Sequence, residues 1–280
     1  MLVFNKIKDL KPHLGSESLK GSSVGFVPTM GALHHGHISL ISQSKKENAL
    51  TICSIFVNPT QFNNPADLTK YPRTPSQDKD LLESAGCDIL YMPDVKDVYP
   101  ENDGRTFDFG YLDTVLEGAH RPGHFNGVGQ VVSILLQAIC PDKAYFGSKD
   151  YQQVMVVKEL VKQLQLKVEI VACPILREED GLAMSSRNTR LSAEERRIAA
   201  LIPTVMQEAN AIAKQQGITP AKDFVRGFIA KQPLMKLDYY EICHADTLEP
   251  VSRLTPLQPA ISLIAVFIGN IRLIDNWPID

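Results

Sequence analysis

The chain has 280 residues, of which 44% are hydrophobic and 22% are charged, and its formal net charge is −3. This length allows one large or two modest domains with a substantial core, and the composition is ordinary for a globular protein. The small negative charge gives no reason to expect binding to nucleic acid or to a membrane, and no stretch approaches the roughly 18 apolar residues of a membrane span.

Apolar segments of β type alternate with helical patterns in the first part of the chain. We expect strands at 23–27, 51–57, 88–91, 143–146 and 168–172, and helices at 38–46, 78–85, 128–139 and 152–164. This order predicts a Rossmann-like, doubly wound α/β fold, in which helices cover both faces of a parallel sheet. Ligands in such folds bind at the carboxyl ends of the strands.

The pattern changes near residue 176. Ser192 and Glu195 form a capping box, which predicts the start of a helix. The expected elements are a helix up to about 212, a second helix around 224–228, strands at 239–244 and 261–268, and a tight hairpin at Gly269-Asn270 leading into a further strand. We therefore expect a Rossmann-like domain at 1–176 and a smaller α+β domain at 177–280.

The five cysteines are widely spaced and include no C-x-x-C pair. An odd number at such spacing argues against a disulfide framework and against a zinc site, and it fits a reducing cytoplasm. The first residues carry no long apolar segment, so no signal peptide is expected.

A pair of histidines, His34 and His37, stands where the first strand gives way to a helix. Their spacing places both rings on one face of the first helical turn, and Gly36 between them allows a ligand close to the backbone. Because a helix N-terminus attracts anions, the pair predicts a phosphate site, most simply that of a nucleotide. The alternatives are histidines that only satisfy the helix end, or a metal site, for which no third ligand is apparent nearby.

Polar segments follow two further strands. Asn58 and Gln61 come after the second expected strand, where amides suit a substrate with hydroxyl and carbonyl groups, although Asn-Pro is also ordinary turn chemistry. Gly147, Lys149 and Asp150 come after the fourth, where Lys149 could reach phosphate oxygens and Asp150 a ribose hydroxyl. A plain capping turn is the alternative for this second segment.

Two less specific features lie between these segments. Asp78 opens a helix, where its carboxylate could hold Mg²⁺ on a triphosphate or could simply complement the helix dipole. Arg121 and His124 stand in a segment rich in glycine and cations, which predicts either a mobile functional loop or a plain surface loop.

The last candidate is the run Met184-Ser185-Ser186-Arg187. Two hydroxyls followed by a guanidinium can clamp a polyphosphate. The alternative is a hydrophilic linker between domains, which is credible for residues 178–181.

The order of these segments along the chain identifies a protein family more specifically than any one segment does. His34-x-Gly36-His37 and the Met184-Ser185-Ser186-Arg187 run resemble the paired HIGH and KMSKS signatures of the adenylate-forming nucleotidyltransferases, the superfamily of the class I aminoacyl-tRNA synthetases. Flanking segments narrow the resemblance to the pantothenate synthetase (pantoate–β-alanine ligase) family. These segments are Pro28-Thr29-Met30-Gly31-Ala32-Leu33-His34, Val57-Asn58-Pro59-Thr60-Gln61-Phe62, Tyr71-Pro72-Arg73-Thr74, Arg121-Pro122-Gly123-His124-Phe125, Phe146-Gly147-Ser148-Lys149-Asp150-Tyr151-Gln152-Gln153 and Leu182-Ala183-Met184-Ser185-Ser186-Arg187-Asn188.

The resemblance implies a two-step ligation. Pantoate would attack the α-phosphate of ATP to give pantoyl adenylate and pyrophosphate, and β-alanine would then give pantothenate and AMP. Mg²⁺ accompanying ATP, a homodimer and a cytoplasmic location are implied as well. The alternatives are a nucleotidyltransferase acting on another small acid or phosphate acceptor, and a non-catalytic nucleotide-binding regulator.

The resemblance also implies roles for individual residues. Catalysis would fall to His34, His37, Lys149, Ser185, Ser186 and Arg187. ATP would be bound by these residues together with Pro28, Thr29, Met30, Gly147, Asp150 and Met184, with the smaller domain closing over the ATP site. Pantoate would be bound by Met30, Gln61 and Gln153, and Asp78 would be the candidate ligand of Mg²⁺.

Overall fold

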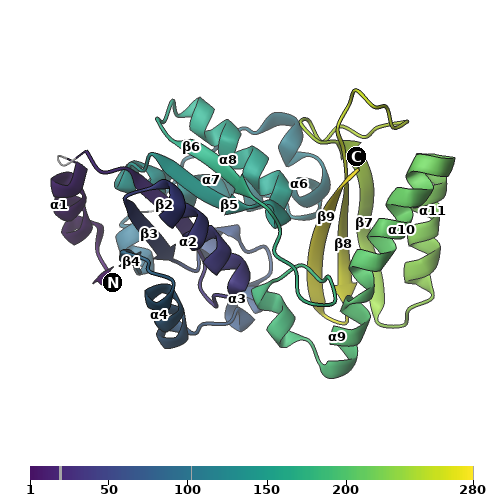
Figure 1. Ribbon diagram of the computed structural model, residues 1–280, viewed down its shortest axis with the longest axis horizontal. Helices are drawn as coiled ribbons and strands as arrows, with labels where there is room; N and C mark the ends of the chain where they lie inside the picture. Colours follow the sequence, from purple (N-terminus) through teal and green to yellow (C-terminus); the bar gives the residue numbers. More distant parts are fainter. Residues whose placement is uncertain (19–20, 102, 280) are drawn as a thin grey trace. The chain divides into compact units, whose positions relative to one another are not determined.

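The structure is a computed structural model that describes residues 1–18, 21–101 and 103–279 (Figure 1). The chain divides into two compact units, Met1–Pro174 and Ile175–Asp280. Within the described residues, no helix is both long and apolar enough to cross a membrane. All five cysteines are free, and only Cys140 is exposed.

The first unit is built on a six-stranded parallel sheet in the order β1-β4-β3-β2-β5-β6. Its strands are β1 (Leu2–Phe4), β2 (Val24–Thr29), β3 (Leu50–Ile55), β4 (Ile89–Tyr91), β5 (Lys143–Gly147) and β6 (Glu169–Cys173). From β2 the chain proceeds through β3 to β4 in one direction, and it later adds β5 and β6 on the other side. The strand order therefore reverses between β2 and β5, the place where open α/β sheets bind ligands.

Helices cover both faces of this sheet, as the sequence predicts. They are α1 (Ile7–Ser18), α2 (His35–Glu47), α3 (Pro65–Lys70), α4 (Pro75–Ser84), α5 (Val95–Val98), α6 (Leu116–His120), α7 (His124–Ile139) and α8 (Tyr151–Gln163), with 3-10 turns η1 (Pro59–Gln61), η2 (Gly110–Asp113) and η3 (Ser148–Asp150).

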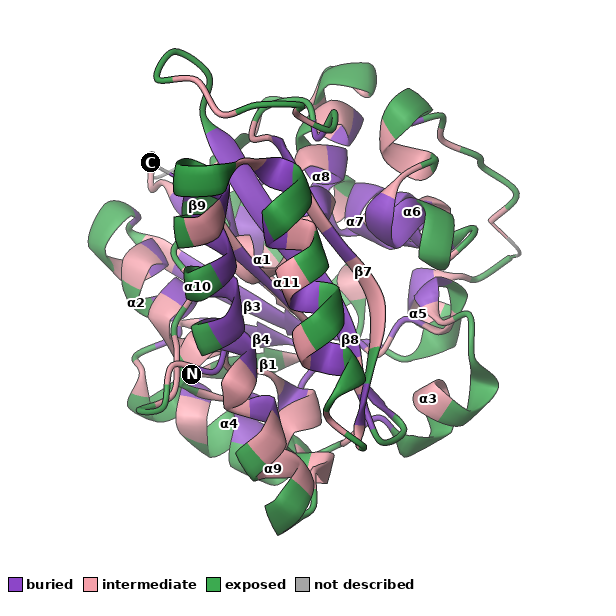
Figure 2. Cartoon of the chain, turned by 90° about the vertical axis from the view of Figure 1, so that its right-hand side faces the viewer, coloured by how far each residue is buried: buried purple, intermediate pink, exposed green. Residues whose placement is uncertain are grey.

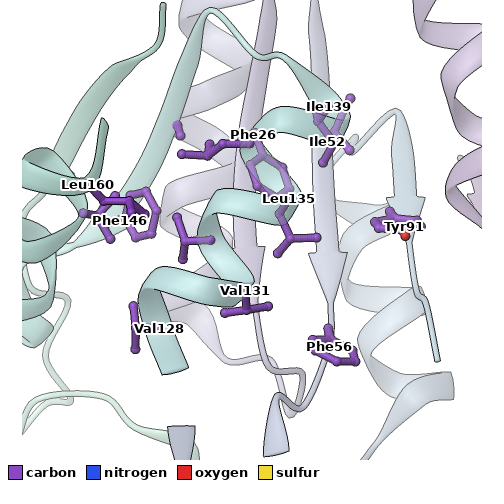
Figure 3. Packing of buried hydrophobic residues seen from close by; sticks show 14 of the residues in the cluster. Phe26, Ile52, Phe56, Tyr91, Val128, Val131, Leu135, Ile139, Phe146 and Leu160 are labelled. Carbon is purple, nitrogen blue, oxygen red and sulfur yellow. The ribbon is translucent and has the colours of Figure 1, made fainter. Parts of the chain in front are cut away.

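The cores on the two faces follow from the alternation of side chains along each strand. Phe26 and Ile52 pack with α1, α7 and α8, whereas their neighbours Val27 and Cys53 pack with α2 and α4. Figure 3 shows apolar residues of α7, among them Leu135, turned toward Phe26 and Ile52. Each large apolar side chain buried in this way contributes about 1.5–3 kcal/mol to folding.

The second unit is an α+β structure. It contains η4 (Ser186–Arg190), the helices α9 (Ala193–Ala199), α10 (Leu201–Gln216) and α11 (Ile218–Ala230), and an antiparallel sheet of β7 (Met235–His244), β8 (Ala260–Ile268) and β9 (Ile271–Ile279). Residues of α10, α11 and the sheet share one core, and Figure 2 shows buried stripes along both helices beside their exposed faces.

Two local predictions in this unit are confirmed. The Ser192 hydroxyl accepts from the Glu195 N–H at 3.2 Å while the Glu195 carboxylate accepts from the Ser192 N–H at 2.8 Å, which is the capping box at the start of α9. Ile268 pairs with Ile271 across the hairpin at Gly269, whose φ of +55° suits a tight turn.

Several element boundaries differ from the prediction. The helix expected up to about 212 is divided into α9 and α10 at Ala200. The helix α4 begins at Pro75 instead of Asp78, because proline is favoured at the first helical position. The helix α7 begins at His124 instead of Val128, which places His124 inside the fold. Neither β1 nor α1 was among the predicted elements.

Candidate functional site

The predicted polar segments of the first unit gather at one edge of the sheet. Thr29 at the end of β2 pairs in register with Ile55 at the end of β3, and β2 also pairs in parallel with β5. The chain leaves these three neighbouring strands into His34–His37, Asn58–Gln61 and Ser148–Asp150 respectively. The candidate site therefore lies at the carboxyl ends of the strands where their order reverses.

The two histidines cap their own helix. His34 is the N-cap of α2, and its Nδ1 accepts from the Gly36 N–H at 3.1 Å. In return, the His37 Nδ1 accepts from the His34 N–H at 3.3 Å, and the ring centroids lie 4.0 Å apart. The arrangement is a capping box in which imidazoles take both roles. Since each Nδ1 is an acceptor, the neutral rings carry their proton on Nε2, which makes Nε2–H a donor in both.

The pKa of His37 lies well below the usual 6.5. Desolvation of the ring is the largest cause, and the positive fields of His34 and Lys149 act in the same direction. His37 is consequently a neutral donor near pH 7. Lys149, from η3, thus acts on a histidine of α2 through its charge, and its Nζ lies 3.8 Å from Asp150 Oδ1.

Gln61 and Met30 are brought together at this edge of the sheet. The Gln61 Nε2 donates to the Met30 sulfur at 3.0 Å, and its Oε1 accepts from the Asn58 side chain at 3.1 Å. Asn58 also donates to the main-chain oxygen of Gly127 at 3.1 Å, which ties η1 to α7. A Cβ at Gly127 would lie only 2.5 Å from the Thr60 oxygen, so this approach of helix and turn requires glycine.

Arg121 is the C-cap of α6 and His124 is the first residue of α7, so the expectation of a plain surface loop is wrong for His124. His124 is 5% exposed, its Nδ1 lies 2.8 Å from the Gln61 oxygen, and its Nε2 lies 3.0 Å from Arg121 Nη1. Because the guanidinium can only donate, Nε2 is the acceptor and Nδ1–H donates to Gln61. Arg121 is held by Glu117 at 3.4 Å. The sequence signal was present in Gly123, a left-handed N-cap that permits the helix to start at His124.

The two adjacent glutamines of α8 have different environments. Gln152 is buried, accepts from the Glu117 N–H at 2.9 Å and donates to the oxygens of Leu112 and Val115 at 2.7 and 3.0 Å. Gln153 is partly exposed, and its side chain makes no hydrogen bond to another residue in the described part of the chain. Gln153 therefore retains the amide that a ligand could use.

Asp78 is bonded within the protein. Its Oδ2 accepts from the Ala32 N–H at 2.9 Å, and its Oδ1 accepts from the Leu33 N–H at 2.7 Å and the Thr74 hydroxyl at 3.0 Å. Across residues 1–18, 21–101 and 103–279, no three His, Cys, Asp or Glu side chains gather as a metal site. The Asp78 carboxylate and its neighbours therefore do not fit a metal ion held by the protein alone.

In the second unit, the Ser185–Arg187 segment starts η4. The Ser185 hydroxyl accepts from the Arg187 N–H at 3.2 Å as the N-cap, and Ser186 is 7% exposed. Asn188 in the same turn donates to Glu178 at 2.8 Å and to the Ala183 oxygen at 3.1 Å. The run is therefore attached to the segment that precedes it.

That preceding segment is anchored, so the alternative of a hydrophilic linker at 178–181 is wrong. Arg177 pairs with Asp275 through its two terminal guanidinium nitrogens, at 2.7 and 3.0 Å, and lies 4.1 Å over the Trp277 ring. Arg196 of α9 binds both Glu178, at 3.0 Å, and Asp180, at 2.6 Å. Bidentate and stacked arginines of this kind hold a turn in one geometry.

Comparisons with known proteins agree with the resemblance seen in the sequence. A family model described as pantoate-beta-alanine ligase matches residues 2–278. The pantothenate synthetases of Bacteroides fragilis and Cytophaga hutchinsonii are each 49% identical, over 276 and 278 residues, with 99% of this chain and 98% of each relative covered.

Solved structures agree as well. The pantothenate synthetase from Thermus thermophilus superposes with a TM-score of 0.91 at 40% identity, covering 100% of this chain and 99% of the other. A pantoate-beta-alanine ligase from Francisella tularensis, complexed with beta-gamma ATP and beta-alanine, gives a TM-score of 0.84 at 38% identity, covering 99% and 97%. The expected α/β fold with a smaller α+β part is thereby confirmed.

Proposed function

The chain belongs to the pantoate-beta-alanine ligase family, and from that premise we propose that it joins pantoate to β-alanine with the consumption of ATP. The observation that carries the proposal is the mutually capped pair His34 and His37 at the point where the strand order reverses, with the charge of Lys149 acting on His37. Two imidazole N–H donors at a helix N-terminus, together with a cation, suit a polyphosphate.

In the first step, an oxygen of the pantoate carboxylate attacks the α-phosphorus of ATP, and the bond to the β-phosphate oxygen breaks. Pantoyl adenylate and pyrophosphate result. Because carboxylate and triphosphate repel one another, the step requires donors that neutralise charge on the departing pyrophosphate. The Nε2–H groups of His34 and His37 and the ammonium of Lys149 supply them, and one such donor is worth about 3 kcal/mol in the transition state.

We assign pantoate to Met30, Gln61 and Gln153. The Gln61 Nε2 donates to a thioether sulfur, which is a weak acceptor, so an oxygen of pantoate is a favourable replacement. Asn58 holds the side-chain oxygen of Gln61 and His124 holds its main-chain oxygen, so the residue stays in place while that exchange occurs.

In the second step, the amine of β-alanine attacks the acyl carbon of the adenylate, and AMP leaves. No residue of the protein forms a covalent intermediate. We assign the rest of the nucleotide to Pro28 and Thr29 at the end of β2, to Gly147 and Asp150 after β5, and to Met184, Ser185, Ser186 and Arg187 of the second unit. The Asp150 carboxylate suits a ribose hydroxyl, and Arg187 suits phosphate oxygens.

We further propose that Mg²⁺ enters as the counter-ion of ATP and is held mainly by phosphate oxygens, as is usual for this ion. The sequence-based assignment of Mg²⁺ to Asp78 competes with the three hydrogen bonds that this carboxylate already accepts. A cytoplasmic location, supported by the five free cysteines, and a homodimer complete the proposal.

Measuring pyrophosphate and AMP with each acceptor added separately tests the function. We expect pyrophosphate release with ATP and pantoate alone, and AMP with pantothenate only after β-alanine is added. Pyrophosphate release that needs some other acid or a phosphate acceptor would indicate a different nucleotidyltransferase. Binding of ATP without pyrophosphate release under any of these conditions would indicate a nucleotide-binding regulator.

A further inference from the structure

We propose that Asp78 is a positioning residue that acts on the reaction through His34 and His37, and not through a metal ion. The inference rests on the proposed function and adds a residue to it. Asp78 lies on α4, 46 and 45 residues along the chain from the two main-chain N–H groups that it binds, and its side chain is 1% exposed. Its contacts are therefore tertiary and enclosed by protein.

The segment that Asp78 holds has a backbone that needs external support. Gly31 and Ala32 both adopt left-handed conformations, with φ of +80° and +48°. A non-glycine residue in that region is strained, and such strain persists only where the surroundings fix it. The two N–H groups that follow, at Ala32 and Leu33, converge on the one carboxylate, which is the pattern of an anion-binding nest.

The fit around this carboxylate is tight. A Cβ at Gly31 would lie 3.0 Å from the Asp78 Oδ2, so the turn closes directly over the anion. Thr74, the N-cap of α4, adds a third donor at 3.0 Å. Burying a carboxylate lowers the stability of the fold unless the group is hydrogen-bonded, and these three donors supply the hydrogen bonds.

The chain passes from this fixed turn straight into the catalytic pair. Leu33, bound to the Oδ1 of Asp78 at 2.7 Å, is followed by His34, the N-cap of α2. A shift of the turn would move the His34 N–H, and that N–H is the group that holds the His37 ring. Asp78 therefore sets the position of both Nε2–H donors without contacting a ligand.

The test is a double-mutant cycle of Asp78→Asn with His37→Ala, read by pyrophosphate release from ATP and pantoate. Asparagine places an N–H₂ where one N–H now donates, so the turn must move. We expect kcat to fall about 10²-fold, with the KM for ATP and the dependence on Mg²⁺ unchanged. In the His37→Ala background, the same change should cause a smaller loss, because only its effect through His34 remains.

The matched control is Asp80→Asn, an exposed carboxylate of the same helix, which should leave kcat unchanged. Wild-type kcat in Asp78→Asn would overturn the proposal. Recovery of the variant by excess Mg²⁺ would overturn it in favour of a metal ligand, and an undiminished loss in the His37→Ala background would show that Asp78 acts independently of the ring.

Two further measurements keep the proposal open to refutation if Asp78→Asn does not fold. Thr74→Val removes one donor to the carboxylate and should lower kcat several-fold in the wild type and by less in His37→Ala. No loss in the wild type, or an equal loss in both, would overturn the proposal. Slow amide exchange at Ala32 and Leu33 in the wild type tests the anchoring without any activity, and fast exchange there would refute it. A wild type that releases no pyrophosphate with pantoate refutes only the proposed function.

Discussion

Replacing His37 by alanine removes two interactions that can be measured separately. The loss of Nε2–H removes one donor to the departing pyrophosphate, worth about 3 kcal/mol, which is a fall in kcat of about 10²-fold. The loss of Nδ1 leaves the His34 N–H without the acceptor that now lies 3.3 Å away. Losing one helix cap lowers the free energy of unfolding by about 1 kcal/mol.

The loss of kcat and the loss of stability are measured in two assays on the same variant. Steady-state pyrophosphate release with pantoate and ATP gives kcat, and urea unfolding gives the free energy of unfolding. His35→Ala is the matched control, because His35 is exposed on the same helix turn and should change neither quantity. A kcat of His37→Ala within a few-fold of the wild type would refute the assignment of the ring to the leaving group, and unchanged stability would refute the capping role.

Four other outcomes follow from contacts described above. In urea unfolding, the wild type should have a higher free energy of unfolding than His37→Ala, and this difference should be complete above about pH 6.5. The difference should shrink as the pH falls below that value, because the His37 ring then binds a proton readily in the unfolded state but not in the folded state. Gln153→Ala should raise the KM for pantoate about 10-fold, in initial rates, without changing that for ATP. Arg177→Ala should lower the free energy of unfolding by about 3–5 kcal/mol, in denaturant melts, because the buried Asp275 carboxylate loses the cation that pairs with it. Gly127→Ala should lower it by about 1–3 kcal/mol and raise the KM for pantoate, because the turn η1 must move.

Each of these substitutions has a control at an unconstrained position. Gln137→Ala changes an exposed glutamine of α7, Arg226→Ala removes an exposed ion pair with Asp223, and Gly15→Ala adds a Cβ that meets nothing within 4 Å. An effect of a control as large as that of its partner would contradict the explanation given for the partner.

The sheet could be predicted because its strands are covered on both faces. Near-continuous apolar runs such as Leu50–Ile55 mark buried parallel strands, and their alternation with helices specifies the fold class. The strand Leu2–Phe4 has only three residues, two of them exposed, and α1 contains Pro12, so neither presented a clear periodic pattern. Helix starts were the least accurate boundaries, because polar first turns such as that of α4 lie outside the apolar period.

Some features of the candidate site could be predicted from the sequence, and others could not. The spacing of His34 and His37 was visible in the sequence, and so was their place at a strand end. Their mutual capping depends on ring orientation, and the contact of Asp78 with the turn at 31–33 joins residues far apart in the chain. Patterns within one segment cannot report such tertiary contacts, which is why Asp78 suggested a metal ligand or a simple dipole effect.

The stacking of Arg177 on Trp277 allows the intrinsic fluorescence of the protein to report on the surroundings of Arg177. Trp277 is the single tryptophan of the chain, and the guanidinium lies 4.1 Å over its ring. Its emission therefore reports on one place, the base of the turn that leads to Ser185–Arg187. Rearrangement of that turn on mixing with nucleotide can be followed by stopped-flow fluorescence without attaching a dye.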